Sequence, residues 1–242
     1  MKIIAHRGYS AKYPENTIAA FRAAAALPIY GVEFDVHLTK DRQIVVIHDE
    51  SIDRTSNGSG FVKDMTLEQL RQYDYGSWFS EEFAGENVPT LSEVLAVFSN
   101  TNFRINIEIK SDIFFYPEIE ELVLRKVDEF GLLDQVIISS FDHESVQRIA
   151  QIAPNVENAS LFANVVLNLT EYQKLIPAKA LHVSLPSAFR QPVLDAIQKG
   201  SLVRVYTVNE KEYVKLLLNS GIDAIFTDEP EMMMEFILRE CE

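Results

Sequence analysis

Cysteine is almost absent from this sequence: its 242 residues contain one, Cys241. A disulfide framework needs paired cysteines, so no internal disulfide is expected, and the simplest compartment is a reducing one. A cysteine nucleophile, or a zinc site built from thiolates, has no residues to support it. The chemistry of this chain must therefore come from other side chains.

Basic residues and long apolar runs are also scarce. The 22 Lys and Arg residues face 36 Asp and Glu residues, and the formal charge of −14 argues against a nucleic acid or an anionic membrane as the main partner. A small phosphate ester is still compatible with this negative charge, because a local cluster of Lys and Arg side chains can make the electrostatic potential positive inside one cleft. No apolar run reaches roughly 18 residues, and no signal-peptide core follows Met1 and Lys2. We expect a cytoplasmic protein without stable membrane insertion, and the oligomeric state is left open.

Hydrophobic residues make up 47% of the chain, enough for one main domain over residues 1–242. Short β-branched segments alternate with helical patterns, which is typical of a parallel sheet built from βα units. Eight such units predict an α/β fold, the (β/α)8 TIM barrel. The predicted strands are residues 2–5, 32–38, 104–110, 135–139, 157–162, 181–185, 202–207 and 224–227. The predicted helices are residues 16–27, 91–98, 117–130, 144–151, 169–175, 191–199, 210–219 and 230–238.

Two segments fall outside this repeat. Residues 44–48 form an extra predicted strand after the second barrel strand, and their connection of about five residues is too short for a parallel crossover, so an antiparallel hairpin is expected. The segment at about residues 50–90 is far longer than an ordinary βα loop. Thr66 and Gln69 predict a capped helix within it. We expect an insertion subdomain that walls or covers the pocket, because βα loops lie on the catalytic face of a barrel.

The hairpin brings acidic side chains together. Side chains alternate along a strand, so Glu33 and Asp35 project from the same face. A turn near residues 41–42 returns His48 to a position opposite Asp35. Carboxylates on apolar strands cost desolvation free energy unless a cation lies among them. The hairpin therefore predicts a metal site.

Two other strands supply matching residues. In RINIEIK, the side chains of Asn106, Glu108 and Lys110 share one face, while isoleucines take the other. The first strand ends in His6 and Arg7. A single histidine, or a strand glutamate near a lysine, is most often structural. Barrel interiors are normally apolar, however, so the gathering of these charges at one end of a barrel predicts a functional site.

The residue types favour phosphate ester chemistry. Carboxylates without thiolates suit Mg²⁺, Ca²⁺ or Mn²⁺. Arg7 and Lys110, together with the metal, can bind and neutralise the oxygens of a phosphodiester. His6 and His48 can serve as general base and general acid on either side of the phosphorus, because imidazole exchanges protons near neutral pH.

Short motifs follow one another along the chain in a specific order: AHRG, PENT, EFDVHLTKD, VVIHD, NGSG, NIEIK, SSF, VYTVN and IFTDEP. Together they resemble the glycerophosphodiester phosphodiesterase family, in its bacterial single-domain form, over nearly the whole chain. The resemblance implies a metal-dependent barrel hydrolase of lipid and glycerol metabolism that cleaves glycerophosphodiesters to sn-glycerol 3-phosphate and an alcohol. The roles it implies are metal ligands at Glu33, Asp35 and Glu108, an acid/base pair at His6 and His48, and phosphate contacts at Arg7 and Lys110.

Two positions depart from the family pattern. Tyr206 stands where the family often has Trp, which can alter how the substrate is seated, and Arg42 stands in the hairpin turn where Gly is common. Glu15 and Asn16 are candidates to support the loop after the first strand, although Asn16 is equally well explained as a helix N-cap. Neither departure touches the predicted metal or acid/base residues.

The expected mechanism passes through a cyclic phosphate. One histidine deprotonates the substrate hydroxyl beside the phosphorylated carbon, that oxygen attacks phosphorus, and the other histidine protonates the departing alcohol. Direct attack by water is left open. The alternatives are a sphingomyelinase D-like phospholipase, which the charge of −14 disfavours, and a non-catalytic phosphate-ester binding protein, which the two histidines disfavour. The sequence leaves the alcohol head group and the physiological metal open.

Overall fold

Eight parallel strands close into a barrel in the computed structural model, which describes residues 1–240. Their order runs β1, β9, β8, β7, β6, β5, β4, β2 and back to β1. Cys241 lies outside the described residues. The predicted α/β barrel is confirmed, with strands β1 (Lys2–His6), β2 (Gly31–Leu38), β4 (Arg104–Ile109), β5 (Val136–Ser140), β6 (Glu157–Phe162), β7 (Ala180–Ser184), β8 (Leu202–Tyr206) and β9 (Ala224–Thr227).

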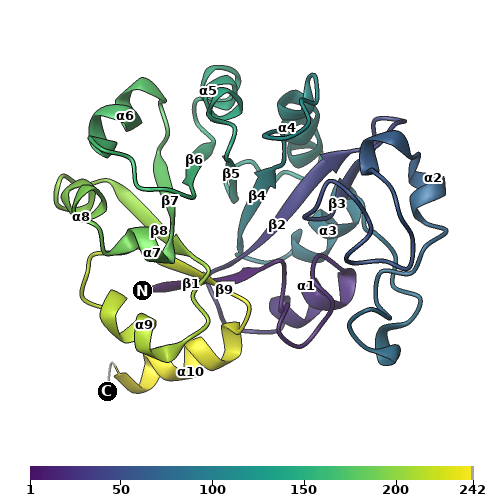
Figure 1. Ribbon diagram of the computed structural model, residues 1–242, viewed down its shortest axis with the longest axis horizontal. Coiled ribbons are helices and arrows are strands. Elements are labelled where there is room, and N and C mark those ends of the chain that lie inside the picture. The colour runs from purple at the N-terminus through teal and green to yellow at the C-terminus, as the bar shows by residue number, and fades with distance from the viewer. Residues whose placement is uncertain (241–242) are drawn as a thin grey trace.

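A ring of helices surrounds the strands (Figure 1). The eight predicted helices are present, and their ends lie within two residues of the predicted ones. The short helix α7 (Leu185–Ala188) was not predicted from the sequence. None of the helices within residues 1–240 has the length and apolar character that crossing a membrane requires. The helices of the ring are α1 (Ile18–Ala25), α3 (Leu91–Phe98), α4 (Ile119–Glu129), α5 (His143–Ile152), α6 (Leu169–Leu175), α8 (Gln191–Gln198), α9 (Lys211–Leu217) and α10 (Pro230–Glu240).

The extra strand β3 (Ile44–Val46) pairs antiparallel with β2, as predicted. Val36 lies opposite Val46, so the same register carried back places Ile47 opposite Asp35, and the Ile47 amide donates to the Asp35 carbonyl over 3.1 Å. The predicted pairing of His48 with Asp35 is therefore wrong by one residue. His48 still reaches the barrel end, because the regular strand stops at Val46 and the chain bends at His48.

Strand β4 shows how alternation separates the core from the site. Ile105, Ile107 and Ile109 are fully buried in the main apolar cluster with residues of α1, α3 and α4. Asn106 and Glu108, on the other face, line a cavity inside the barrel. The period of two along one strand thus places apolar side chains under the helices and polar side chains around the barrel axis.

The segment between β3 and α3 contains the short 3-10 helices η1 (Val62–Asp64) and η2 (Glu81–Phe83) and the helix α2 (Leu67–Leu70). Thr66 and Gln69 form the predicted capping box at the start of α2. In Figure 1 this insertion lies at the edge of the molecule beyond β3. Its apolar side chains pack with those around β3 in a separate cluster of Val45, Ile47, Ile52, Val62, Leu70, Tyr75 and Val88.

A buried arginine holds together the end of the barrel opposite the strands' C-terminal ends. Arg204 is 1% exposed and donates to Glu157 over 2.5 Å, to Asp223 over 3.0 Å and to His182 Nε2 over 3.1 Å. Burial and the Arg204 charge hold the pKa of His182 well below its ordinary value. The neutral imidazole therefore accepts from the guanidinium, which has no acceptor atom.

Replacing Arg204 with Met is expected to lower the free energy of unfolding by about 1 to 3 kcal/mol, because Glu157 and Asp223 would each lose a buried hydrogen-bonded cation and keep only their second partners, Arg104 and Lys2. Arg239→Met is the matched control, since that arginine is 77% exposed and, within residues 1–240, pairs with Glu235 alone, and its loss is expected below about 0.5 kcal/mol. Urea denaturation measures both values. Equal losses in the two variants would contradict a structural role for the Arg204 network.

Candidate active site

A cavity of about 240 Å³ opens toward the C-terminal ends of the barrel strands. One part of its lining is polar, comprising His6, Arg7, Glu33, His48, Asn106, Glu108, His182 and Thr207. The other part carries larger apolar surfaces, from Phe141, Leu161, Tyr206 and Phe226. The cavity thus offers a charged side for a phosphate group and an aromatic side for the carbon skeleton of a small molecule.

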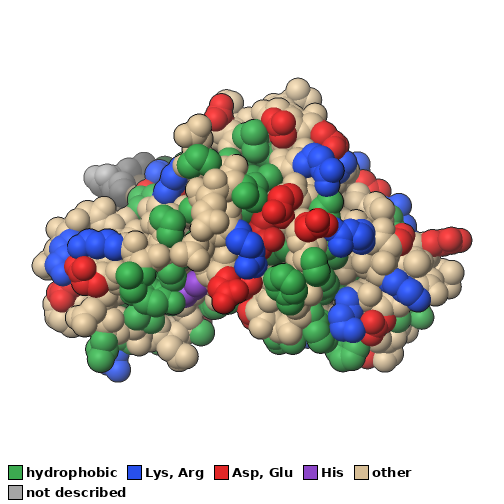
Figure 2. Space-filling model, turned by 90° about the horizontal axis from the view of Figure 1, so that it is seen from above, with side chains coloured by type: hydrophobic (Ala, Val, Ile, Leu, Met, Phe, Trp, Pro, Cys, Tyr) green, Lys and Arg blue, Asp and Glu red, His purple; other side chains and the backbone are tan. Residues whose placement is uncertain are grey.

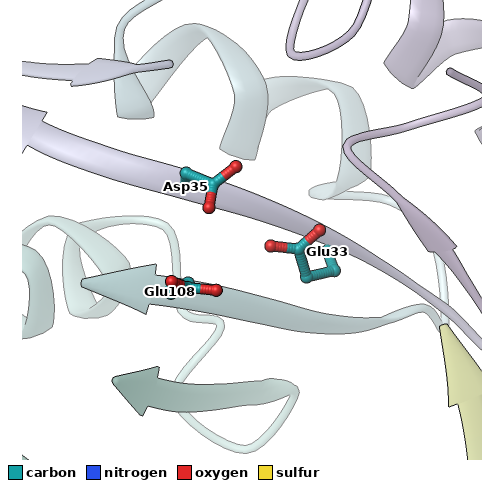
Figure 3. A group of neighbouring side chains, drawn as sticks. All are labelled: Glu33, Asp35 and Glu108. Carbon is teal, nitrogen blue, oxygen red and sulfur yellow. The ribbon is translucent and has the colours of Figure 1, made fainter. Parts of the chain in front are cut away.

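Three buried carboxylates meet beside this cavity (Figure 3). Glu33 and Asp35 come from β2 and Glu108 from β4, where Asp35 and Glu108 are register partners. The structure brings one oxygen of each to within 4.8 Å of the others, and the three residues are at most 8% exposed. The alternation of β2 and the parallel register of β4 are sufficient to produce this cluster.

The electrostatics of this cluster fit a bound cation. Burial, with the charges of Asp35 and Glu108, raises the pKa of Glu33 well above its ordinary value. Burial and the Asp35 charge likewise raise the pKa of Glu108 to about 7. Burial alone would also raise the pKa of Asp35, but the charges of Arg7, His48 and Lys110 lower it to about 2. Three oxygen donors that repel one another in a dry site form the ligand set that a hard divalent cation prefers.

Two cationic side chains flank the carboxylates. The Arg7 amide donates to Glu33 over 3.0 Å, and its guanidinium donates to Glu15 over 2.8 Å while Nε lies 3.6 Å from Asp35. Lys110 donates to Glu108 over 3.0 Å.

The outer face of the molecule carries both kinds of charge. Figure 2 shows basic and acidic side chains interspersed on the face seen from above, so neither charge dominates that face.

The two histidines are each held by a carboxylate at Nδ1. His6 lies 2.7 Å from Asp228, and His48 lies 2.6 Å from Asp49. Lys110 Nζ, which can only donate, lies 3.5 Å from His48 Nε2. Neutral His48 therefore carries its proton on Nδ1, and the lone pair on Nε2 faces Lys110. Burial and the charges of Arg7 and Lys110 lower the pKa of His48, despite the opposing effect of Asp35.

Several residues at this end of the barrel were missed in the sequence or given another role. Asp228 and Asn209 carry ordinary signals for a helix start, yet Asp228 holds His6, and Asn209 donates to Asp228 over 2.6 Å. Asp49, directly after His48 in VVIHD, was a local signal that could have been used. The N-cap of α1 is Thr17, whereas Asn16 donates to Asp35 over 2.9 Å, so the N-cap explanation of Asn16 is wrong.

Tyr206 forms part of the cavity wall. Its side chain is half-buried, donates to the Phe162 carbonyl over 2.9 Å and packs edge-on against Phe141.

The insertion does not form part of the cavity wall. Residues 50–90 contribute nothing to the lining, because their apolar side chains pack against the outer face of the hairpin. The expectation that the insertion walls the pocket is therefore wrong.

Comparison with known proteins agrees with these features. The profile of the "Glycerophosphoryl diester phosphodiesterase family" matches residues 6–232. Glycerophosphodiester phosphodiesterases from Caldanaerobacter subterraneus subsp. tengcongensis and Bacillus altitudinis are each 41% identical, covering 97% and 95% of both chains, respectively. A phosphodiesterase from Oleispira antarctica, solved with the product sn-glycerol-3-phosphate, superimposes with a TM-score of 0.88 at 29% identity, covering 98% of this chain and 96% of that chain. The chain belongs to the glycerophosphoryl diester phosphodiesterase family.

Proposed function

We propose that the protein hydrolyses glycerophosphodiesters to sn-glycerol 3-phosphate and an alcohol, using one divalent cation. The observation that carries this proposal is the buried group of Glu33, Asp35 and Glu108, placed within one cavity region with two carboxylate-held histidines. The product bound in the Oleispira antarctica relative supports a substrate of this class. A cytoplasmic location stays a prediction from the sequence.

The carboxylate trio is the proposed metal site. Its donors are all oxygen atoms, which favours Mg²⁺ or Ca²⁺, with Mn²⁺ as a third candidate. The bound cation would supply positive charge to the phosphate oxygens and stabilise the charge added during phosphoryl transfer. Asn16 would steady the trio from outside, because its amide holds Asp35.

Arg7 and Lys110 are the proposed phosphate contacts. Both stay protonated, because the neighbouring carboxylates raise the pKa of each despite burial. Glu15 fixes the Arg7 guanidinium, and Glu108 fixes the Lys110 ammonium, so the two positive charges are already in place when a substrate enters. Such preorganised cations lower the cost of placing charge on phosphoryl oxygens in the transition state.

The two histidines are the proposed acid/base pair. His48 is suited to act first as the base, since its unprotonated nitrogen is Nε2 and Asp49 holds the opposite nitrogen. It would take the proton of the substrate hydroxyl, whose oxygen then attacks phosphorus, while His6 protonates the departing alcohol. Water would open the resulting cyclic phosphate with the two roles reversed.

The remaining residues would shape the substrate. We propose that Tyr206, held by the Phe162 carbonyl and packed on Phe141, seats the carbon skeleton on the apolar side of the cavity. We also propose that residues 1–242 act as one domain with an insertion subdomain at about residues 50–90. The separate apolar cluster of that insertion supports this division.

The direct test is an assay of glycerophosphocholine, glycerophosphoethanolamine, glycerophosphoglycerol and glycerophosphoinositol with Mg²⁺, Ca²⁺ or Mn²⁺. Release of sn-glycerol 3-phosphate from at least one diester is expected, with little action on an intact phospholipid. Preferential cleavage of the lipid would favour the sphingomyelinase D-like alternative, and metal-dependent binding without turnover would favour a binding protein. An analogue without the neighbouring hydroxyl should be inert, and its hydrolysis at an undiminished rate would contradict the cyclic route.

His6→Ala and His48→Ala are each expected to lower kcat by about 10² to 10⁴, because each removes a proton-transfer group. The circular dichroism spectrum and metal binding should stay close to those of the unaltered protein. His143→Gln is the control, since that imidazole binds Tyr172 and the Leu161 carbonyl outside the predicted acid/base pair. Retained turnover in either alanine variant would overturn that residue's assignment.

Glu108→Gln is expected to weaken cation binding at least about tenfold, because ligand charge sets the affinity of oxygen sites for divalent ions. Isothermal titration of Mg²⁺ or Ca²⁺ into chelator-treated protein measures the change. Glu144→Gln is the matched control, because Glu144 lies on α5 with its side chain 87% exposed. Unchanged affinity in the Glu108 variant would argue against the carboxylate trio as the metal site.

A further inference from the structure

Arg54 makes an unusual number of charged contacts for a residue of the insertion. Its Nη1 and Nη2 donate to the two oxygens of Glu15, each over 2.8 Å. Its Nε and Nη2 donate to the two oxygens of Asp49 over 2.7 Å and 3.1 Å. One guanidinium thus engages two carboxylates in paired hydrogen bonds, although its side chain is 44% exposed. An ordinary exposed ion pair has no such geometry and contributes little.

Both of these carboxylates continue inward to the active site. Glu15 Oε1, which accepts from Arg54, also accepts from Arg7 Nη1 over 2.8 Å. Asp49 Oδ1, which accepts from Arg54, lies 2.6 Å from His48 Nδ1. The contacts form an unbroken chain from Arg7 through Glu15, Arg54 and Asp49 to His48. The insertion therefore reaches the site through the Arg54 side chain, although it does not line the cavity.

We propose that Arg54 is a positioning residue, which couples the phosphate-binding arginine Arg7 to the base His48 through Glu15 and Asp49. The assignment rests on the proposed roles of Arg7 and His48. It gives the long insertion a part in the reaction: the insertion carries the cation that fixes two functional side chains relative to each other. Arg54 itself belongs neither to the cavity lining nor to the carboxylate trio.

Charge balance supports this arrangement. Burial alone would raise the pKa of Glu15, but the hydrogen bonds and charges of Arg54 and Arg7 lower it. Burial alone would likewise raise the pKa of Asp49, but its hydrogen bonds with Arg54 and His48 lower it to about 2. Both acids therefore stay ionised and act only as acceptors. An ionised Asp49 requires a proton on His48 Nδ1, which leaves Nε2 unprotonated for the role of base.

The shape of arginine matters as much as its charge. A planar guanidinium can present parallel N–H pairs to two carboxylates at once, whereas a lysine ammonium is a point charge that cannot hold both in a fixed orientation. Without Arg54, Glu15 and Asp49 would repel each other and turn toward solvent. His48 would then lose its fixed tautomer and Arg7 its fixed rotamer, although the barrel would keep its fold.

The test compares Arg54→Ala and Arg54→Lys with the unaltered protein. Both variants are expected to lose about 10- to 100-fold in kcat/KM, since small misplacements of reacting groups cost rate on this scale. The ¹⁵N shifts of the His48 imidazole in the metal-free protein should show the Nδ1–H tautomer in the unaltered protein and a mixture in both variants. Millimolar guanidinium should restore part of the activity of Arg54→Ala, because it can fill the vacated site between the two carboxylates.

Arg71→Ala is the matched control. Arg71 follows α2 in the same insertion and pairs with Glu93 over 2.5 Å, away from the site. Its kcat/KM should stay within about twofold of the unaltered value, and its His48 tautomer should not change.

Three outcomes would overturn the proposal: unaltered kcat/KM in Arg54→Ala, an unaltered His48 tautomer, or an activity loss that follows a lowered Tm and is not rescued by guanidinium. If the proposed function is wrong, the unaltered protein will release no sn-glycerol 3-phosphate from any diester. That outcome is distinct from the three that would overturn the role of Arg54. The tautomer measurement does not depend on turnover, so it reports on Arg54 in either case.

Discussion

Mutual repulsion among three buried carboxylates is the constraint on which the rest of this site depends. Glu33, Asp35 and Glu108 lie with oxygens within 4.8 Å of one another in a region that solvent hardly reaches. A folded protein tolerates such a group only if positive charge compensates it or protonation removes part of its charge. Arg7 and Lys110 supply part of that charge from the protein, and the proposed cation supplies the remainder. The same positive charges are those that a phosphodiester requires.

The barrel accommodates this concentration of charge because it separates the charged side chains from the apolar core. Isoleucines of β4 pack under the helices, while its polar side chains face the barrel axis. At the other end of the barrel, the buried Arg204 pairs with Glu157 and Asp223 in a second network, to which Arg104 and Lys2 add further positive charge. The insertion beyond β3 has its own apolar cluster and contacts the site by polar links. Each end of the barrel therefore has its own network of paired charged side chains.

Much of this arrangement follows from the sequence, because it is local. Alternation along single strands was enough to place Glu33 beside Asp35, and Asn106 beside Glu108. Contacts between distant parts of the chain were beyond the same reasoning: His6 and Asp228 are 222 residues apart, and Asp228 resembles a helix start in the sequence. The hairpin register was wrong by one residue because a turn can be centred on either of two adjacent positions. Nothing local in DRTSNG indicates that Arg54 joins Glu15 to Asp49.

The proposed function requires that a cation bound among the carboxylates creates the phosphate-binding site. Calorimetric titration of sn-glycerol 3-phosphate into chelator-treated protein, with and without one equivalent of Mg²⁺ or Ca²⁺, tests this directly. The cation is expected to tighten binding about tenfold or more, and Glu108→Gln is expected to remove this gain. Equal affinity with and without the cation would contradict the proposal.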